Sequence, residues 1–584
     1  MSSLDPDDYI SLPIPPVPKT QGLTSSTFKI PPLDGSLTLP QIYDWNLKHS
    51  PTHPLFEYAD EDGVITTLTW AQVVRGVHHA GAYVKLKIAK DQQRSLEDRP
   101  IVSILAYTDF VTYFTFLVGI LRAGYVAAFI SPRNSPEAIA HLLSNTNSHY
   151  IFVGSEAALQ TSAIQSMDIL TARYPTIRAP VIFPMVTFED LYHPDSQGVL
   201  NGQSEVELPP CDVKLSDSAL FTHSSGSTAY PKSIRFNHHR YLLLCLAPFY
   251  GEHDKTGLRM SSHSIPMYHG MGMVQTAWTA ASGMIITTPK PHSPALPITA
   301  ESTLTGAVAT KSDVIFCVPT FIEEWSRDSE CIKHLKNLKG VWFGGSPLSK
   351  EVGDELTDQG VNILNTYGIA ECGGLMSPLF PENLGKDWIY FKFTPNIKPF
   401  FISSGDQYSA AHILPNPHHV PCVLNSTVDH NTRTAYATND YLEPHPTRPD
   451  YWRVVDRVDN EIIHSSGLKT HPGPLETILH HDPYIESAVI FGNGREKPGV
   501  IIDPRGDHKF DPVDKDKLAE FRKMVWPSVE RLNQYAPPQS RISEEMILVS
   551  SPHKPFVYTA KFSVRRQAMI ELYQPEIDAL YIGP

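Results

Sequence analysis

The alternation of β-rich and helix-patterned stretches early in this chain limits it to a small set of folds. These stretches follow one another as strand-like residues 100–106, helix-like residues 110–122, strand-like residues 125–130, helix-like residues 137–144 and strand-like residues 150–153. Strands that alternate with helices form parallel sheets, because a parallel crossover needs about the length of a helix. The sequence therefore predicts an α/β fold built from βαβ units.

The same alternation returns in the middle of the chain. Residues 314–318, 340–343 and 361–366 have strand composition, and residues 349–359 suit a helix. The strand at 340–343 is followed at once by Gly344-Gly345-Ser346-Pro347. Glycines that directly follow parallel strands lie at the carboxyl edge of a sheet, where such folds bind ligands. A simple turn is the alternative interpretation of these glycines.

The length and the changes in composition indicate several domains. A chain of 584 residues exceeds what one hydrophobic core supports. Residues 1–40 are rich in Pro and Ser and predict an extended segment that lies over the fold. Residues 390–455 carry short β-rich runs among Pro, His and Asn, and predict a small β subdomain. We expect strands in it at 421–424, 434–438 and 451–455.

A charged strand end at 456–459 marks the main boundary. The predicted division is residues 1–455, a large core with helices, mixed sheets and the β subdomain, and residues 456–584, a small mobile α+β domain. The predicted fold class is thus α/β with a second, smaller C-terminal domain.

Charge and residue usage exclude several classes of function. The formal net charge is −14, so no general affinity for nucleic acid or an anionic membrane is expected. The six cysteines form no C-x-x-C pair, and adjacent histidines lack zinc-site spacing, which predicts reduced thiols and no structural zinc. No signal peptide and no membrane-spanning run stands out, so we expect a cytoplasmic protein.

The segment from His223 to Lys232 carries the clearest chemical signal. It holds four Ser or Thr hydroxyls, one glycine and one lysine in ten residues, directly after a strand-like run at 218–222. Small hydroxylated residues and glycine let a backbone wrap around an oxyanion, and lysine adds a positive charge. The Walker pattern is absent, so the segment predicts a phosphate-binding loop of another type.

Seven motifs in fixed order resemble those of the adenylate-forming superfamily, which comprises acyl-CoA ligases, luciferases and the adenylation domains of nonribosomal peptide synthetases. The resemblance covers roughly residues 40–570. The motifs are Ser224-Ser225-Gly226-Ser227-Thr228 with Pro231-Lys232; residues 266–272; residues 344–348; residues 365–371; residues 436–440; Arg457-Val458-Asp459; and Thr559-Ala560-Lys561.

A narrower resemblance points to the adenylation domains of fungal synthetase-like carboxylic acid reductases, a group of secondary metabolism. It rests on residues 467–476, on Trp526-Pro527-Ser528-Val529-Glu530, and on the tail from Leu572 to Tyr581. In that group a carrier domain and often a reductase domain follow the tail. This chain ends there, which is expected of an excised or a freestanding module.

The resemblance implies ATP-dependent formation of an acyl adenylate and transfer of the acyl group to a phosphopantetheine thiol, with Mg²⁺ on the phosphates. Glu371 would hold the metal ion, although a carboxylate at a helix N-terminus is the alternative. Tyr367 would stack on adenine or else pack in the core. The remaining residues implied to bind the nucleotide are Ser224, Ser225, Gly226, Ser227, Thr228, Lys232, Gly344, Gly345, Ser346, Asn365, Gly368, Asp440 and Arg457.

Asp440 and Arg457 would bind the ribose, and Asp459 would be the hinge on which the small domain turns. A strand-end ion pair is the alternative role for Arg457 and Asp459. The family commonly has glycine where Asn439 and Asp456 stand. Asn tolerates positive φ better than most residues, so we expect the turn at Asn439 to survive.

Lys561 would be the catalytic lysine that contacts the carboxylate and the α-phosphate. His269 would lie beside the substrate carboxylate. Amino-acid-activating relatives place Asp where Gly270 stands, so the sequence predicts an acid without an α-amino group, aryl or fatty. The residues expected to form the acyl pocket are Met267, Tyr268, Gly270, Met271 and Met273.

Two alternatives remain open from the sequence. One is an acyl-CoA ligase that uses free CoA in place of a carrier protein in cis or in trans. The other is a degenerate member that binds nucleotide or a partner without turnover. The second arises because the family's usual residues are replaced at Ala229, Ala370, Asn439, Asp456 and Ala560.

Overall fold

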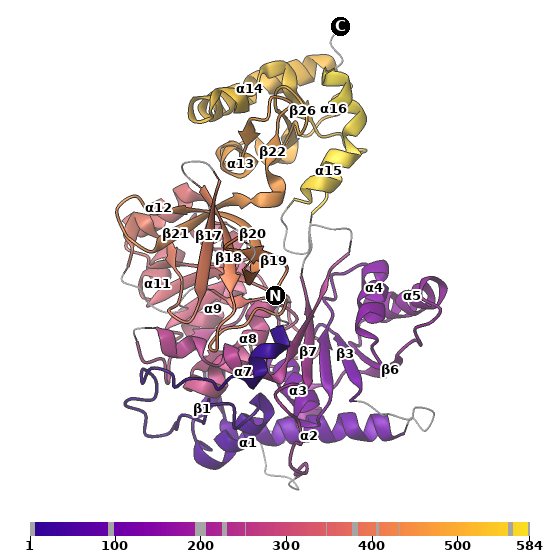
Figure 1. Ribbon diagram of the computed structural model, residues 1–584, viewed down its shortest axis with the longest axis vertical. Coiled ribbons are helices and arrows are strands. Elements are labelled where there is room, and N and C mark those ends of the chain that lie inside the picture. The colour runs from indigo at the N-terminus through magenta and orange to yellow at the C-terminus, as the bar shows by residue number, and fades with distance from the viewer. Residues whose placement is uncertain are drawn as a thin grey trace. The chain divides into compact units, whose positions relative to one another are not determined.

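The computed structural model shows the protein as two compact units (Figure 1). It describes residues 6–90, 99–192, 206–224, 230–251, 253–345, 347–375, 383–404, 408–430, 432–558 and 564–581. The large unit comprises Met1–Gly226, Tyr230–Pro399 and Ile413–Tyr436. The small unit comprises Ser227–Ala229, Phe400–His412 and Ala437–Pro584. No helix within the described residues is both long and apolar enough to span a bilayer.

The first sheet of the large unit confirms the predicted βαβ pattern. Its strands lie in the order β6 (Val181–Pro184), β5 (Tyr150–Val153), β3 (Ile101–Leu105), β4 (Val126–Phe129), β7 (Ser218–His223) and β8 (Ser233–Asn237). All neighbouring pairs are parallel except β7 and β8. Strands β5 and β4 are fully buried and β3 is buried except at its first residue, as expected of a sheet covered by helices on both faces.

The second sheet of the large unit carries the Gly344-Gly345 strand end. Its strands lie in the order β13 (Ile363–Thr366), β12 (Gly340–Gly344), β11 (Val314–Cys317), β9 (Arg259–Ser261), β10 (Ile285–Thr287), β1 (Pro54–Ala59) and β2 (Ile65–Thr69). The pairs from β13 to β1 are parallel, and β2 is antiparallel to β1. The strands predicted at 314–318, 340–343 and 361–366 are thereby confirmed.

Helices cover both faces of the first sheet. Helices α2 (Trp70–Ala89) and α3 (Phe110–Arg122) pack against one another and share a core with β3. Helices α4 (Pro136–Thr146) and α5 (Ala157–Arg173) form a second cluster with β5, and Figure 1 shows them side by side. Helix α3 is buried over its whole length, so its apolar residues surround it on all sides.

Among the other helices of the large unit, the first precedes the first strand and the rest lie between strands in the sequence. They are α1 (Leu39–His49), α6 (Phe188–Tyr192), α7 (His238–Leu244), α8 (Gly270–Ser282), α9 (Ala300–Ala309), α10 (Pro319–Trp325), α11 (Ser329–Lys336) and α12 (Lys350–Asp358). Helices α7, α8, α9, α10 and α12 each follow a strand directly in the chain, as is typical of βαβ units.

The N-terminal segment lies over the large unit as predicted, but it is not extended throughout. A 3₁₀ helix covers Pro6–Ser11. Further along, the Nε2 group of Gln21 donates hydrogen bonds to the carbonyl oxygens of Pro248 (3.0 Å) and His253 (3.0 Å). Asp7 forms an ion pair with the buried Arg240 (2.7 Å). Side-chain contacts therefore fix the segment on the fold.

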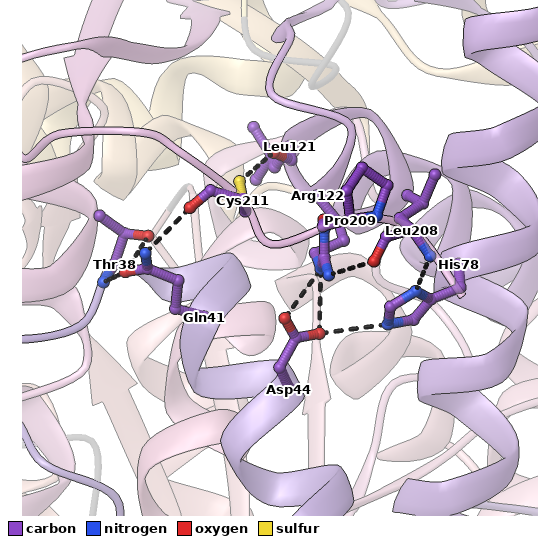
Figure 2. A network of polar contacts seen from close by, with 9 residues as sticks. All are labelled: Thr38, Gln41, Asp44, His78, Leu121, Arg122, Leu208, Pro209 and Cys211. Carbon is purple, nitrogen blue, oxygen red and sulfur yellow. Dashed lines mark hydrogen bonds and ion pairs between the residues drawn. The ribbon is translucent and has the colours of Figure 1, made fainter.

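A buried ion-pair network joins α1, α2 and α3 (Figure 2). Arg122 Nε lies 2.9 Å from a carboxylate oxygen of Asp44, and its Nη1 and Nη2 groups donate to the carbonyls of Pro209 (2.7 Å) and Leu208 (3.1 Å). His78 lies 3.2 Å from the same carboxylate and accepts the Leu208 N–H (2.9 Å). The network ties residues 208–209 to the helices.

Strands β17 (Lys398–Ser404), β18 (Tyr408–Leu414), β20 (Arg433–Pro444) and β21 (Tyr451–Arg457) form the β subdomain, in the order β21, β20, β18, β17. The strands predicted at 434–438 and 451–455 are confirmed, but the strand predicted at 421–424 is wrong. The nearest strand is β19 (Ser426–Val428), and the N–H of Cys422 donates to the carbonyl of Glu371 (2.7 Å) instead of joining a ladder.

The C-terminal part of the small unit has a core of its own, made by residues between Ile462 and Ile577. Its main sheet has the order β24 (Ile485–Phe491), β25 (Gly499–Pro504) and β26 (Ile547–Val549), and β22 (Ile462–Ile463) pairs with β23 (Lys469–Thr470). The helices are α13 (Pro472–His480), α14 (Lys515–Tyr535), α15 (Arg566–Leu572) and α16 (Gln574–Tyr581). The boundary at 455/456 stays a prediction.

Candidate nucleotide and acyl site

The base of the predicted phosphate loop is closed by hydrogen bonds. The N–H of Ser224 donates to the carbonyl of Lys232 (3.0 Å), next to the antiparallel pair β7–β8. His223, the last residue of β7, accepts the N–H of Ser131 (3.0 Å) from the end of β4. The two ends of the loop are therefore fixed to the carboxyl edge of the parallel sheet. Lys232 is exposed there.

Gly344 leaves room at the end of β12 that a side chain would fill. A Cβ at this position would lie 3.2 Å from the carbonyl oxygen of Thr366 on β13 and 3.5 Å from Sδ of Met271. Gly345 follows with φ +90°, a conformation that glycine adopts without strain. The structure thus brings Met271, predicted for the acyl pocket, beside the strand end predicted for adenine.

The motif at 365–371 crosses from β13 into a tight hairpin. Asn365 pairs with Phe343 across β12–β13 and donates from Nδ2 to the carbonyl of Ile389 (2.9 Å). Tyr367 is nearly buried and stacks on Phe391 at 4.7 Å between ring centroids. One of its faces is therefore occupied by protein.

Glu371 lies at the turn of this hairpin, between β14 (Gly368–Ile369) and β15 (Gly373–Gly374). Gly368 pairs with Gly374, and a Cβ on Gly368 would lie 3.0 Å from the carbonyl of Gly373. Because Glu371 is not in a helix, the alternative of a helix N-terminal carboxylate is wrong. Its half-buried side chain leaves the metal-binding role as a prediction.

The predicted ribose group lies on β20 and β21 in the small unit. Asp440 pairs with Arg457 across the two strands, and Arg457 Nη1 donates to Asp440 Oδ1 (3.2 Å) and to the carbonyl of Thr438 (3.1 Å). Asn439 has φ +59°, which confirms that asparagine keeps the turn where the family commonly has glycine. Asn439 lies within β20, and the Asp440 carboxylate that follows it is nearly buried.

Arg457 also contacts the predicted hinge residue. Its Nε donates to Asp459 Oδ1 (3.0 Å) and its Nη2 to Asp459 Oδ2 (3.4 Å). Burial alone would lower the pKa of Arg457, but Asp459 and Asp440 outweigh it and hold that pKa above its usual value. The strand-end ion pair named as an alternative is therefore present, and a guanidinium that also contacts Asp440 remains compatible with ribose binding.

The N-terminus of α8 holds the residues predicted for the acid. His269 precedes the first residue of the helix, Gly270, and its ring lies 4.9 Å from that of Tyr268. Among the described residues, a Cβ on Gly270 would meet no atom within 4 Å. Met267 and Met273 are buried in the main core. The helix start is therefore open at Gly270 and apolar on either side.

A cavity of about 390 Å³ lies beside the segment that precedes this helix, within the large unit. Met267 and Tyr268 line it, whereas Gly270, Met271 and Met273 do not. Its remaining walls come from segments that follow β3, β4, β5, β9 and β10, so it opens at the carboxyl edges of both sheets. Such edges are the usual ligand sites of α/β proteins.

Two polar groups of this cavity have no hydrogen-bond partner among the described residues. They are the phenol oxygen of Tyr113, a residue that is 2% exposed, and Oε2 of Glu156. Asp109, at the start of α3, also lines the cavity, and burial raises its pKa to about 6 against hydrogen bonds from Thr112. Arg133 and Lys290 are exposed at the lining. Buried polar groups normally find partners, so the cavity is suited to a ligand that supplies them.

Sequence reasoning missed Tyr113 and Glu156. Tyr113 belongs to a helix that reads as uniformly apolar, and nothing local marks its hydroxyl as unpartnered. Six predicted site residues lie outside the described residues: Ser225, Gly226, Ser227, Thr228, Ser346 and Lys561. The structure assembles the others in two groups, one in each unit, and their meeting on one nucleotide stays a prediction.

The residues present fit a nucleotide in two respects. The strand end at Gly344 is a cradle that any Cβ would fill, and Asp440 offers a fixed carboxylate of the kind that accepts hydroxyl hydrogen bonds. In the part of the chain that the structure describes, no three His, Cys, Asp or Glu side chains gather as a metal site. A Mg²⁺ ion that is bound together with ATP often takes most of its ligands from phosphate and water.

The sheet order, the glycine strand end and the predicted ribose group are those expected of a class of proteins, the ATP-dependent, AMP-forming ligases. The sequence profile of the AMP-binding enzyme family matches residues 43–391, and that of the AMP-binding enzyme C-terminal domain matches residues 459–583. This chain belongs to the AMP-binding enzyme family.

Fungal reductases are among its relatives. The adenylate-forming reductase Nps10 of Heterobasidion annosum is 44% identical over 98% of this chain and 52% of its own length. Nps11 of Serpula lacrymans is 30% identical over 95% of this chain and 50% of its own length. A carboxylic acid reductase of Neurospora crassa is 27% identical over 82% and 44%. The chain spans about half the length of these curated relatives.

Solved structures confirm the fold. The anthranilate CoA ligase AuaEII in complex with anthranoyl-AMP superposes with a TM-score of 0.66 at 14% identity, over 92% of this chain and 97% of that one. The O-succinylbenzoate CoA synthetase of Bacillus subtilis, in complex with ATP and magnesium, gives 0.66 at 13% identity, over 90% and 98%. The predicted fold class and the predicted resemblance are both confirmed.

Proposed function

We propose that the chain uses ATP and Mg²⁺ to convert a carboxylic acid without an α-amino group, aryl or fatty, into an acyl adenylate. The acyl group then passes to the phosphopantetheine thiol of a carrier protein. Gly270 is the observation that carries the choice of acid. It stands at the open start of α8 beside His269, and it offers no carboxylate to an ammonium group.

The chain's own residues would perform the first step by position and charge. The acid's carboxylate and the phosphates repel one another, so the site must hold them in line and supply positive charge. Lys232 would hold the outer phosphates, Lys561 the carboxylate and the α-phosphate, and Asp440 the ribose. Mg²⁺ held by Glu371 would neutralise phosphate charge. The carboxylate oxygen bonds to the α-phosphorus, and pyrophosphate leaves.

The cavity beside Tyr268 suits the acceptor arm better than the acid. A phosphopantetheine arm carries two amides, a hydroxyl and a phosphate on an otherwise apolar chain. Tyr113 and Glu156 would give its amides a donor and an acceptor, and Arg133 or Lys290 could face its phosphate. A fatty tail has no polar group to pair with Tyr113 and Glu156, and leaving buried polar groups without a hydrogen bond costs free energy.

A pyrophosphate-exchange screen over aryl, fatty and α-amino acids tests the choice of acid. We expect exchange with aryl or fatty acids, and Gly270→Asp should suppress it while raising exchange with α-amino acids. The position can hold the new side chain because its Cβ direction is open. Exchange strongest with an α-amino acid in the unmodified chain would overturn the proposal.

Tyr113→Phe tests the acceptor site, with Tyr250→Phe as the matched control. Both tyrosines have a buried hydroxyl without a partner, but Tyr250 does not line the cavity. Loss of one hydrogen bond predicts up to about tenfold slower transfer to a holo-carrier protein, with acid-dependent exchange unchanged. A raised KM for the acid in exchange would instead place the acid in the cavity.

Two further functions are separated by simple assays. Thioester formation with free CoA but not with holo-carrier protein would identify an acyl-CoA ligase, a function named for the two solved structures above. ATP binding by calorimetry without turnover that depends on Lys561 would identify a degenerate binder. The relatives named as reductases are about twice as long, so we place reduction of the thioester to an aldehyde in another domain.

A further inference from the structure

We propose that Asp456 is a positioning residue that caps helix α13 across the predicted hinge and holds the start of that helix to strand β21. The residue stands where the family commonly has glycine. Its contacts lie entirely within the small unit. The effect on turnover rests on the proposed function, whereas the capping contact does not.

The carboxylate of Asp456 accepts three hydrogen bonds. Oδ1 accepts the N–H of Arg457 (2.7 Å) and the Nδ2 group of Asn460 (3.0 Å), and Oδ2 accepts the N–H of Gly473 (2.6 Å). Asp456 is only 7% exposed. A buried carboxylate needs such donors, so the three contacts are what keep this charge stable inside the unit.

Helix α13 has no cap of its own. His471 occupies the cap position and makes no side-chain hydrogen bond to the first turn. The first N–H groups of a helix have no partner inside the helix, and a negative charge near them is favourable. Asp456 supplies both the acceptor and the charge from a position 17 residues earlier in the chain.

Gly473 is matched to this contact. A Cβ on Gly473 would lie 2.8 Å from Cγ of Asp456 and 2.9 Å from its Oδ2. Real Cβ atoms do not approach so closely, so any other residue would push the carboxylate away from the helix. The aspartate at 456 and the glycine at 473 therefore depend on one another.

The contact between Asp456 and the N–H of Gly473 is called the clasp below. The predicted hinge, Asp459, lies between these two residues in the sequence. A rotation at Asp459 that moves the following residues relative to β21 would draw the N–H of Gly473 away from Asp456. The clasp thus favours one hinge setting over the others. A hinge contact of this kind changes turnover without touching the nucleotide.

Helix α13 carries the constraint further into the small unit. Glu476, in the same helix, forms an ion pair with Arg566, whose Nη1 also donates to the carbonyl of Ile490 (2.8 Å). Arg566 begins α15 and follows Lys561 by five residues in the sequence. The clasp and this ion pair therefore connect the hinge to the segment that follows the predicted catalytic lysine.

Two measurements on Asp456→Ala test the proposal together: amide hydrogen exchange and the kinetics of ATP–pyrophosphate exchange. Asp514→Ala is the matched control. Asp514 caps α14 through the N–H of Lys517 (3.2 Å) but does not span the hinge. We expect amide exchange in residues 472–480 to accelerate about tenfold or more in Asp456→Ala, as loss of a charged hydrogen bond predicts. Acid-dependent pyrophosphate exchange should fall in kcat with the KM for ATP unchanged.

The control should speed amide exchange only in the first turn of α14 and leave kcat unchanged. Gly473→Ala should reproduce Asp456→Ala, and the double variant should be no worse than either one. Unchanged amide exchange in α13 would show that Asp456 does not cap the helix. Faster amide exchange with an unchanged kcat of pyrophosphate exchange would overturn the positioning role. A wild type without turnover would count against the proposed function, while the amide exchange would still decide about the cap.

Discussion

Two arginines in this molecule have similar partners and different surroundings. Arg122 contacts Asp44 and two backbone carbonyls, and its side chain is 3% exposed (Figure 2). Arg457 contacts Asp440, Asp459 and one backbone carbonyl, and its side chain is 42% exposed. The first joins α3 to α1 and to residues 208–209, and the second lies at the end of two strands.

The difference separates an ion pair that links structural elements from one that is predicted to bind the ribose. Arg122 donates to Asp44 and to the carbonyls of Leu208 and Pro209, so removing it takes the donor from two backbone carbonyls. The Asp440 carboxylate accepts a hydrogen bond from Arg457 (3.2 Å), and the arginine of this pair stays partly exposed. The burial of the arginine distinguishes the two ion pairs where residue type does not.

Replacement of Arg122 by Met should have the largest effect, and the effect should be on folding. The substitution removes three contacts and leaves the carbonyls of Leu208 and Pro209 without donors. We expect the free energy of unfolding to fall by about 3 kcal/mol. Urea denaturation followed by tryptophan fluorescence measures it. A loss below the level of an exposed pair such as Lys333–Glu330, less than about 1 kcal/mol, would contradict the structural role.

Asp440→Ala should come next, and its effect should be on nucleotide binding. Loss of charge-assisted hydrogen bonds to the ribose predicts ATP affinity weaker by about 2 kcal/mol, or roughly thirtyfold. Folding should change little, because Arg457 keeps Asp459 and solvent. Calorimetric titration with ATP gives the affinity. Unchanged affinity would remove Asp440 from the site.

The stability that the Arg122 network contributes should depend on pH through the ionisation of Asp44. Burial opposes ionisation of Asp44, but hydrogen bonds from His78 and Arg122 and the charge of Arg122 hold its pKa below the usual 3.8. A lowered pKa gives stability that is complete above the unfolded value and is lost as pH falls through the folded value.

We therefore expect the stability difference between wild type and Asp44→Asn to be constant from about pH 8 to pH 5 and to shrink below about pH 4. Urea midpoints across this range measure it. Loss of the difference between pH 5 and pH 7 would contradict the assignment to Asp44.

The smallest effect is expected for Glu443→Gln. Glu443 pairs with Arg453 on the same two strands as Asp440 and Arg457, three residues further along β20. The pair is partly exposed, so its loss should cost less than about 1 kcal/mol and leave ATP affinity unchanged. An effect as large as that of Asp440→Ala would show that strand pairing, and not the ribose contact, explains both.

The sequence predicted the parallel sheets well because their signal is local. Runs such as 314–318 and 340–343 combine buried β-formers with glycine or proline stops, and both became strands. The strand expected at 421–424 failed because Cys422 bonds to Glu371, a residue far away in the sequence. Local composition carries no information about such a partner.

In the candidate site, too, features set by local sequence could be predicted and features set by distant partners could not. Asn439 could be predicted to keep positive φ, since residue type alone decides that preference. The role of Asp456 could not, because its partner Gly473 is reached only after the chain has folded back. The sequence could not predict that the Tyr113 hydroxyl finds no partner among the described residues, because that depends on which elements surround α3.

Acid-dependent ATP–pyrophosphate exchange, compared among wild type, Glu371→Gln and Asp440→Ala, tests most directly whether residues of the two units act on one nucleotide. We predict exchange in the wild type that requires both the acid and Mg²⁺, and a loss of about tenfold or more in each variant. Full exchange in either variant would show that its residue lies outside the site and would contradict the account.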